Sequence, residues 1–284
     1  MRSSIFLIVL SGLVFACGQS HAEHPAKRVA VVCDLGGVLL DTNTTAAFWH
    51  IGPWQYLNYY ASSWPHTRST KALLYQTLDR IWPRESCHFP ACDNEGNTLP
   101  QIICDWLKGT PDTYYLLEYV TEQINSHPEY FINSAEQQLA KSLISLLFNP
   151  EIFINTRIFL APGLQFIREC KEQGHELYLL SNWDSISFKI LTEQAQDIFN
   201  LFDGILISGD CGLLKPDPAI FKLMLKKFNL NPCDCLYLDD QAENIIAAQK
   251  LGIRSVLIAQ KSGLLAAWPD FSMAYNELEH AARA

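Results

Sequence analysis

The feature that most constrains the fold is a series of short, uninterrupted apolar runs separated by amphipathic helical stretches. The first two runs are Val29–Cys33 and Leu177–Leu180. Three more follow in the second half of the chain, at Ile205–Ile207, Leu236–Leu238 and Val256–Ile258. Runs that are apolar at every position are typical of parallel strands, because helices cover both faces of a parallel sheet. The alternation of strands and helices therefore predicts an α/β fold with a doubly wound parallel sheet.

A different pattern fills the long region after the first strand. This region holds most of the tyrosines and five of the seven tryptophans. Leucines recur at helical spacing, as from Leu139 to Leu147, whereas the stretch from Pro83 to Pro100 is rich in loop-forming residues. We expect a mostly helical domain at 42–160, inserted into a discontinuous α/β core at 28–41 and 161–284.

The N-terminus has the pattern of a secretory signal peptide. Arg2 precedes an apolar run from Ile5 to Ala16, and polar and small residues follow. The sequence predicts a signal peptide at 1–22, cleaved after Ala22, and a periplasmic or secreted protein. Two alternatives stay open, a lipoprotein anchored through Cys17 and an uncleaved membrane anchor. A membrane partner is expected only if the chain is lipidated or anchored in this way.

Nine cysteines are compatible with an oxidising compartment. Cys87, Cys92 and Cys104 lie in one irregular stretch and are the expected disulfide formers, whereas Cys33 is expected to be a buried thiol in the first strand. No cysteine or histidine spacing suggests zinc. The formal net charge of -9 disfavours nucleic acid and anionic lipid as partners.

Polar residues stand where the predicted strands end. Asp34 follows the first strand, Ser181 ends the second, Asp239 and Asp240 end another, and Lys215 precedes a helix. The carboxyl ends of parallel strands meet at one edge of a sheet, so these side chains should share a pocket. Three carboxylates repel one another unless a cation neutralises them. Because all the candidate ligands are oxygens, the pattern predicts a magnesium site.

In the same order, these segments resemble the four motifs of the haloacid dehalogenase-like superfamily. The matching residues are the nucleophile Asp34, the phosphate-binding Ser181 with its usual neighbour Asn182, then Lys215, and the acidic pair Asp239 and Asp240. The resemblance extends from about Val29 to Ile258. It implies a Rossmann-like core, and the inserted region lies where the family has a helical cap.

The resemblance also implies an activity, a Mg²⁺-dependent phosphohydrolase that acts on a small phosphorylated metabolite through an aspartyl-phosphate on Asp34. Mg²⁺ would be held by Asp34, the carbonyl of Gly36, Asp240, and Asp239 directly or through water. Lys215 would hold the nucleophile and the phosphate in place. Ser181 and Asn182 would bind phosphate oxygens. The sequence specifies neither the phosphate ester nor an oligomeric state.

Gly36 departs from the family pattern. Most phosphatases of the family have a second Asp two residues after the nucleophile, where it serves as general acid and base. Loss of a general acid typically lowers a rate by about 10²–10⁴-fold. We expect either a substrate whose leaving group needs little protonation, or a proton donated by Asp41 or a cap residue.

Two other functions and several structural roles compete with this interpretation. A metal-independent 2-haloacid dehalogenase tolerates a residue such as Gly36 but would not need the acidic pair, and a non-catalytic binding protein would explain Gly36 alone. Asp240 could instead be a helix N-cap paired with Glu243 in a capping box. Asp41 could be an N-cap or hinge residue, and Trp183 could be core or line the pocket.

Overall fold

The computed structural model describes residues 28–83, 89–93, 95–258, 260–262 and 267–283. The expected signal peptide at 1–22 and the expected disulfide former Cys87 lie outside these residues. Within them, no helix is long and apolar enough to cross a membrane.

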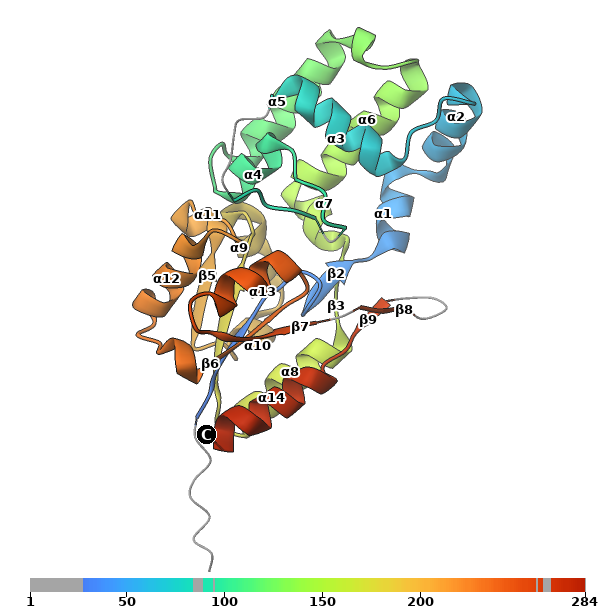
Figure 1. Cartoon of the computed structure of the whole chain (residues 1–284). Helices are drawn as coiled ribbons and strands as arrows, with labels where there is room; N and C mark the ends of the chain where they lie inside the picture. The colour runs from blue at the N-terminus through green and yellow to red at the C-terminus, as the bar shows by residue number, and fades with distance from the viewer. Residues whose placement is uncertain (1–27, 84–88, 94, 259, 263–266, 284) are drawn as a thin grey trace, which may run out of the picture.

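A five-stranded sheet forms the centre of the molecule (Figure 1). Its strands, in spatial order, are β5 (Gly204–Ile207), β4 (Glu176–Ser181), β1 (Ala30–Cys33), β6 (Cys235–Asp239) and β7 (Arg254–Leu257). Every neighbouring pair is parallel. The predicted parallel sheet is therefore confirmed, and each of the five apolar runs contributes one strand.

Helices cover both faces of this sheet, as its apolar runs require. Val31 and Cys33 of β1 face one apolar cluster, in which α8 (Ala161–Glu172), α9 (Ser185–Gln194) and α14 (Ser272–Arg283) take part. Ala30 and Val32 face a second cluster, formed with α12 (Pro218–Lys227) and α13 (Ala242–Gln249). Alternate residues of one strand are thus buried on opposite faces, which makes the sheet doubly wound. Cys33 is a buried thiol, as expected.

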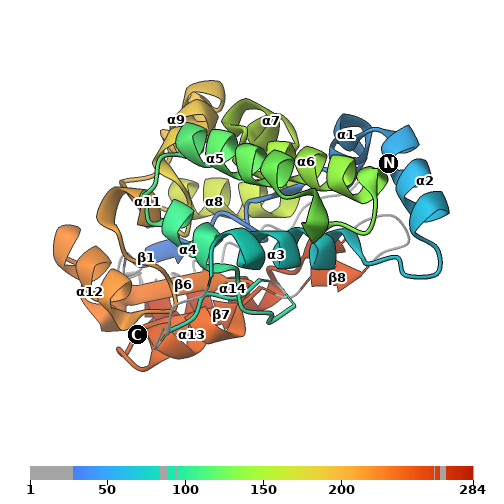
Figure 2. The ribbon, with the colours of Figure 1, turned by 90° about the horizontal axis from the view of Figure 1, so that it is seen from above.

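Among the described residues, seven α-helices follow β1 and precede α8 in the sequence, and they form a helical insert. They are α1 (Thr44–Ile51), α2 (Pro53–Ser63), α3 (Thr70–Ile81), α4 (Gln101–Leu107), α5 (Thr113–Ser126), α6 (Ser134–Phe148) and α7 (Pro150–Asn155), with a 3-10 turn η1 at Pro128–Tyr130. Leu139, Leu143 and Phe148 of α6 are buried against the surrounding helices. Seen from above, α5 and α6 run side by side across the molecule (Figure 2).

A two-stranded antiparallel ribbon connects this insert to the sheet. It pairs β2 (Leu40–Thr42) with β3 (Arg157–Phe159), so the chain enters and leaves the insert at one place. The remaining elements are α10 (Gln196–Phe199), α11 (Ser208–Cys211), the 3-10 turn η2 (Pro232–Asp234) and the ribbon of β8 (Gln260–Ser262) with β9 (Ala267–Pro269).

The insert also contacts the sheet domain directly. The hydroxyl of Ser208 on α11 donates to the carbonyl of Leu107 at 2.5 Å. The hydroxyl of Thr113 on α5 donates to Asp184 Oδ1 at 2.9 Å, and Asp184 is the N-cap of α9. These polar contacts hold the insert against the carboxyl ends of β4 and β5. Cys92, in the loop before α4, has a free thiol, so the expectation of a disulfide is wrong for this residue.

Candidate active site

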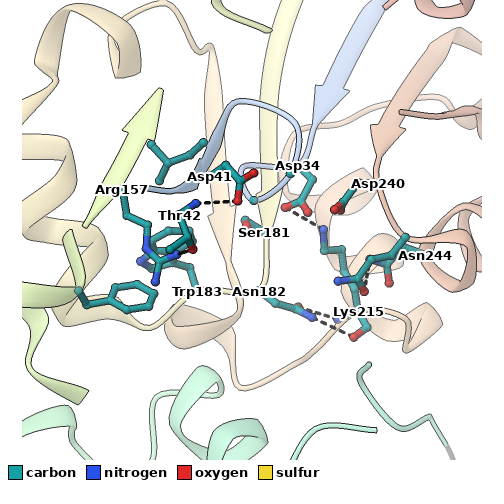
Figure 3. A pocket seen from close by; sticks show the side chains of 15 residues that line it. Asp34, Asp41, Thr42, Arg157, Ser181, Asn182, Trp183, Lys215, Asp240 and Asn244 are labelled. Atoms are coloured by element: carbon teal, nitrogen blue, oxygen red, sulfur yellow. Dashed lines mark hydrogen bonds and ion pairs between the residues drawn. The ribbon is translucent and has the colours of Figure 1, made fainter. Parts of the chain in front are cut away.

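A cavity of about 240 Å³ lies at the carboxyl ends of the strands (Figure 3). It is lined by the loop after β1, the end of β4, the segment that follows β6, Lys215, α7 and the β2–β3 ribbon. The sequence-predicted residues Asp34, Gly36, Ser181, Asn182, Lys215 and Asp240 all line it. Asp239 lies behind this surface, close to Asp34 and Asp240. The structure therefore brings all seven predicted residues together.

Asp34 is placed by the tight loop that follows β1. Its own backbone N–H donates to Leu238 O on β6, and the N–H of Leu35 donates to its Oδ1 at 2.7 Å. The loop then folds back, since Gly37 N–H donates to Leu40 O. Asp34 as a whole residue is only 6% exposed. One carboxylate oxygen is thus held by the backbone, and the side chain lines the cavity.

Lys215 is a fully buried cation between two carboxylates. Its Nζ lies 2.9 Å from Asp34 Oδ1 and 2.7 Å from Asp239 Oδ2. Burial would lower the pKa of Lys215, but the charges of Asp239 and Asp34 outweigh this effect, and its pKa lies above the ordinary value. Lys215 is therefore a fixed positive charge at neutral pH, directed at the candidate nucleophile.

Asp239 is engaged by several donors at once. Its Oδ2 accepts from Lys215, from the hydroxyl of Tyr237 and from Asn244 Nδ2, and its Oδ1 accepts from the N–H of Gln241 at 2.8 Å. The side chain has no exposed surface. With this many bonds, Asp239 is suited to orienting Lys215 and Asn244.

Asp240 lies closer to the open cavity and approaches the loop after β1. Gly37 has a φ of 70°, and a Cβ built on it would lie 2.0 Å from Asp240 Oδ2. Only glycine therefore lets this carboxylate lie against the loop. Burial, together with the charges of Asp34 and Asp239, raises the pKa of Asp240 to about 8. Burial also raises the pKa of Asp34 to about 6, although Lys215 opposes the shift.

This group of oxygens fits a divalent cation. One oxygen from each of Asp34, Asp239 and Asp240 lies within 4.8 Å of the other two. Burial and the repulsion between neighbouring carboxylates raise the pKa values of Asp34 and Asp240, and the charge of a bound cation would oppose both effects. Asn244 Oδ1 is buried beside them without a hydrogen-bond partner. Carboxylate and amide oxygens with room for water are the donors that Mg²⁺ prefers.

Ser181 and Asn182 lie together at the end of β4 but have different environments. A hydrogen bond from the Ser181 side chain lowers the pKa of Asp34 in part, so the hydroxyl reaches the nucleophile. The amide of Asn182 makes two bonds to the backbone of Lys215: it donates to the carbonyl at 3.0 Å and accepts from the N–H at 2.8 Å. Asn182 thus positions Lys215, and its expected contact with phosphate stays a prediction.

A family comparison agrees with this geometry. The model of the haloacid dehalogenase-like hydrolases matches residues 29–252, which span most of the chain and all the residues described above. The chain belongs to this family.

Two fungal proteins are among the relatives of this hydrolase. It is 36% identical over 87 residues to a sesquiterpene phosphatase of Aspergillus oryzae, an alignment that covers 31% of this chain and 44% of the relative. It is 36% identical over 98 residues to a drimenol cyclase of Aspergillus calidoustus, which covers 34% of this chain and 18% of the relative. The chain thus spans less than half the length of both curated relatives.

A solved structure shares the fold. A HAD family enzyme from Bacteroides thetaiotaomicron superposes with a TM-score of 0.56 at 18% identity, over 88% of this chain and 98% of that one. That enzyme was also solved in a complex with magnesium and inorganic phosphate, which superposes with a TM-score of 0.51 at 17% identity over 84% and 98% of the chains. At this identity the likeness shows the fold of the hydrolase alone.

Two of the competing structural roles are excluded by the structure. The N-cap of α13 is Gln241, so Asp240 does not form the capping box with Glu243. The N-cap of α1 is Asn43, so Asp41 is not a cap either; it lies in the ribbon strand β2. Trp183 is both core and pocket wall, since it is 7% exposed and lines the cavity.

Sequence reasoning missed four polar residues of the cavity. Thr42 and Arg157 come from the ribbon, Gln241 is the N-cap of α13, and Asn244 lies on α13. Asn244 lies one helical turn after Asp240, and this spacing could have indicated it. Arg157 is distant in sequence from every motif, and only the pairing of β2 with β3 brings it to the cavity.

Proposed function

We propose that this hydrolase is a Mg²⁺-dependent phosphatase that acts on a small phosphorylated metabolite, with Asp34 as its nucleophile. The observation that carries the proposal is the buried contact of Asp34 with Lys215 beside two further carboxylates. A carboxylate held against a fixed cation in a cavity can attack a phosphate ester, whereas a general base for water would need no such lysine.

The arrangement supports a two-step reaction. Because Oδ1 of Asp34 is held by Leu35 N–H and Lys215, we assign the attack on phosphorus to Oδ2. The P–O ester bond breaks, the leaving oxygen takes a proton, and water then hydrolyses the aspartyl-phosphate to inorganic phosphate. Lys215 and Ser181 would stabilise charge on the phosphoryl oxygens. Mg²⁺, held by Asp34, Asp240 and the carbonyl of Gly36, would supply further positive charge.

The helical insert would act as a cap. Its contacts through Leu107 and Thr113 hold it over the carboxyl ends of the strands, and Phe153 of α7 forms part of the cavity wall. A cavity of about 240 Å³ is smaller than the usual range for drug-sized ligands, which supports a small substrate.

We expect the purified protein to hydrolyse p-nitrophenyl phosphate with Mg²⁺ and to lose this activity in a chelator, because the carboxylates need a cation to tolerate a phosphate dianion. Release of p-nitrophenol is followed by absorbance. In parallel, halide release from 2-chloropropionate is measured without metal. Halide release, together with no effect of the chelator, would identify a dehalogenase and overturn the proposal.

Gly36 can be replaced by the acid that most phosphatases of the family have at this position. A Cβ on Gly36 meets no atom within 4 Å, and its φ is not positive, so an Asp can be accommodated there. We expect Gly36→Asp to raise kcat for alkyl phosphates by at least about tenfold and to change p-nitrophenyl phosphate hydrolysis little, since only poor leaving groups need protonation. Gly36→Ala is the matched control. An equal rate with alkyl phosphates would show that Asp41, or another group, already donates the proton.

We also propose secretion, on the pattern of residues 1–22 alone. Sequencing the N-terminus of the mature protein tests this: a start at Glu23 supports it, and an intact Met1 in the expression host contradicts it.

A further inference from the structure

Arg157 lies in the same cavity as Asp34 but on a different wall. It is the first residue of β3 and belongs to the ribbon that connects the insert to the sheet. Figure 3 shows Arg157 and Asp34 on opposite sides of the cavity, with Asp41 between them. A group bound at Arg157 would therefore be a separate part of the ligand from the phosphate at Asp34.

The hydrogen bonds of this guanidinium are incomplete. Nη1 donates to the hydroxyl of Thr42 across the ribbon, whereas Nε is buried and has no partner. In the part of the chain that the structure describes, only two buried side-chain polar atoms lack a partner, and the other is Asn244 Oδ1. Both belong to residues that line this one cavity. Buried donors without partners are rare in proteins, and a bound ligand is one explanation for them.

The charge of Arg157 is also poorly compensated. Burial lowers its pKa to about 10, and the charge of Asp41 opposes the shift only in part. The group is still cationic at neutral pH. By comparison, Arg68 in the insert lies 2.7 Å from the buried carboxylate of Glu136. Arg157 has no ion pair with any carboxylate of the described residues, and its guanidinium instead stacks over the Phe153 ring at 4.0 Å.

A purely structural role would not explain this arrangement. The contact with Thr42 and the stacking on Phe153 hold the side chain in one orientation, but neither satisfies Nε. A fixed, planar guanidinium with an N–H donor that has no acceptor matches the geometry of a carboxylate or phosphate. The packing of Phe153 against Trp183, with ring centroids 5.5 Å apart, further fixes the wall on which the guanidinium rests.

We propose that Arg157 binds a second anionic group of the substrate, so that the preferred substrates are small phosphate monoesters that also carry a carboxylate or another phosphate. This inference rests on the proposed phosphatase function and narrows its substrate class. The size of the cavity limits the spacing between the two acidic groups to a short chain. Arg157 would act in binding and specificity, while the chemistry remains at Asp34.

The test compares three phosphate esters of similar size with the wild type and Arg157→Gln. The esters are 2-phosphoglycolate, ethylene glycol bisphosphate and 2-hydroxyethyl phosphate. The third has an uncharged hydroxyl where the other two have a second acidic group. We expect Arg157→Gln to raise KM for at least one doubly acidic ester by about 10–100-fold, as expected for a lost charge-assisted bidentate contact. KM and kcat for 2-hydroxyethyl phosphate should change less than about twofold. The ester with the larger loss identifies the second group as carboxylate or phosphate.

An equal loss with all three esters, or no loss with any, would overturn the inference. Arg157→Lys keeps the positive charge but lacks the planar pair of N–H donors of the guanidinium, so we expect an intermediate KM. This variant also serves as the test if Arg157→Gln does not fold. Arg168→Gln removes an exposed arginine of α8, outside the cavity, and should leave every value unchanged.

Direct binding separates this inference from the proposed function. Phosphonoacetate, a non-hydrolysable molecule with both acidic groups, is titrated calorimetrically into wild type, Arg157→Gln and Arg157→Lys in the presence of Mg²⁺. Binding that weakens in Arg157→Gln, without turnover of any ester, would uphold the anion site and reject the phosphatase. Turnover of the esters with unchanged phosphonoacetate affinity would uphold the phosphatase and reject the site.

Discussion

Replacing Asp34 with asparagine is expected to lower kcat for p-nitrophenyl phosphate by at least about 10⁴-fold, because the change removes the attacking group itself. An amide has nearly the shape of a carboxylate, so its oxygen can still accept from Leu35 N–H and Lys215. It cannot form a covalent bond to phosphorus. The loss should therefore appear in kcat and should persist at saturating Mg²⁺.

The stability of this variant distinguishes a functional effect from misfolding. The pKa of Asp34 is raised to about 6 by burial, so its ionised form destabilises the metal-free fold above that pH. Asp34→Asn removes this cost, and its melting temperature at pH 8 without metal should equal or exceed that of the wild type. Asp197→Asn makes the same change at an exposed carboxylate of α10 and should leave kcat unchanged. Retained activity in Asp34→Asn would reject Asp34 as nucleophile.

Much of the fold could be predicted because its signals are local. An uninterrupted apolar run such as Val29–Cys33 is typical of a strand in a sheet that is covered on both faces. Once five such runs are recognised as parallel strands, the residues after them must converge at one edge, so the sequence alone indicates Asp34, Ser181 and Asp239. Only two properties are needed, the position of each residue directly after its strand and the common direction of the strands.

The parts that could not be predicted depend on contacts between distant segments. The bonds of the Asn182 amide to the backbone of Lys215 are invisible to a motif, because they join residues that are adjacent only after β4 and the loop before α12 have packed. The capping box at Asp240 was a valid local pattern that the structure does not use, because the carboxylate lies instead against Gly37. Local preference was overridden by the tertiary arrangement of the site.

The largest effect on stability is expected from Lys215→Met. Methionine keeps the length of the buried stem but removes the charge that Asp34 and Asp239 share. Without it both buried carboxylates lose their counter-charge, whereas Asp34→Asn leaves Lys215 paired with Asp239. Leaving a buried charge uncompensated in this way costs about 3–5 kcal/mol. For a protein of this size the melting temperature should fall by about 10 °C. Activity should also be lost, because the phosphate and the nucleophile would no longer share a counter-charge.

The pH dependence of the loss of stability in Lys215→Met provides the decisive measurement. A carboxyl group whose pKa is raised by folding favours the folded state below its unfolded value, about 3.9, and disfavours it as the pH rises through the folded value. In the wild type these folded values are about 6 for Asp34 and about 8 for Asp240. Without Lys215 both should rise further. The deficit in melting temperature should thus be small near pH 4 and grow up to about pH 8.

Magnesium should reverse part of this deficit, because it supplies positive charge to the same oxygens. We expect Mg²⁺ to raise the melting temperature of Lys215→Met at pH 8 at least as much as that of the wild type, with no return of activity. Lys222→Met removes an exposed lysine of α12 and serves as the control, with no change at any pH. A deficit that is equal at pH 4 and pH 8 would show that Lys215 acts through packing. A deficit that grows with pH and shrinks with Mg²⁺ would show that the lysine and the metal balance one shared cluster of buried carboxylates.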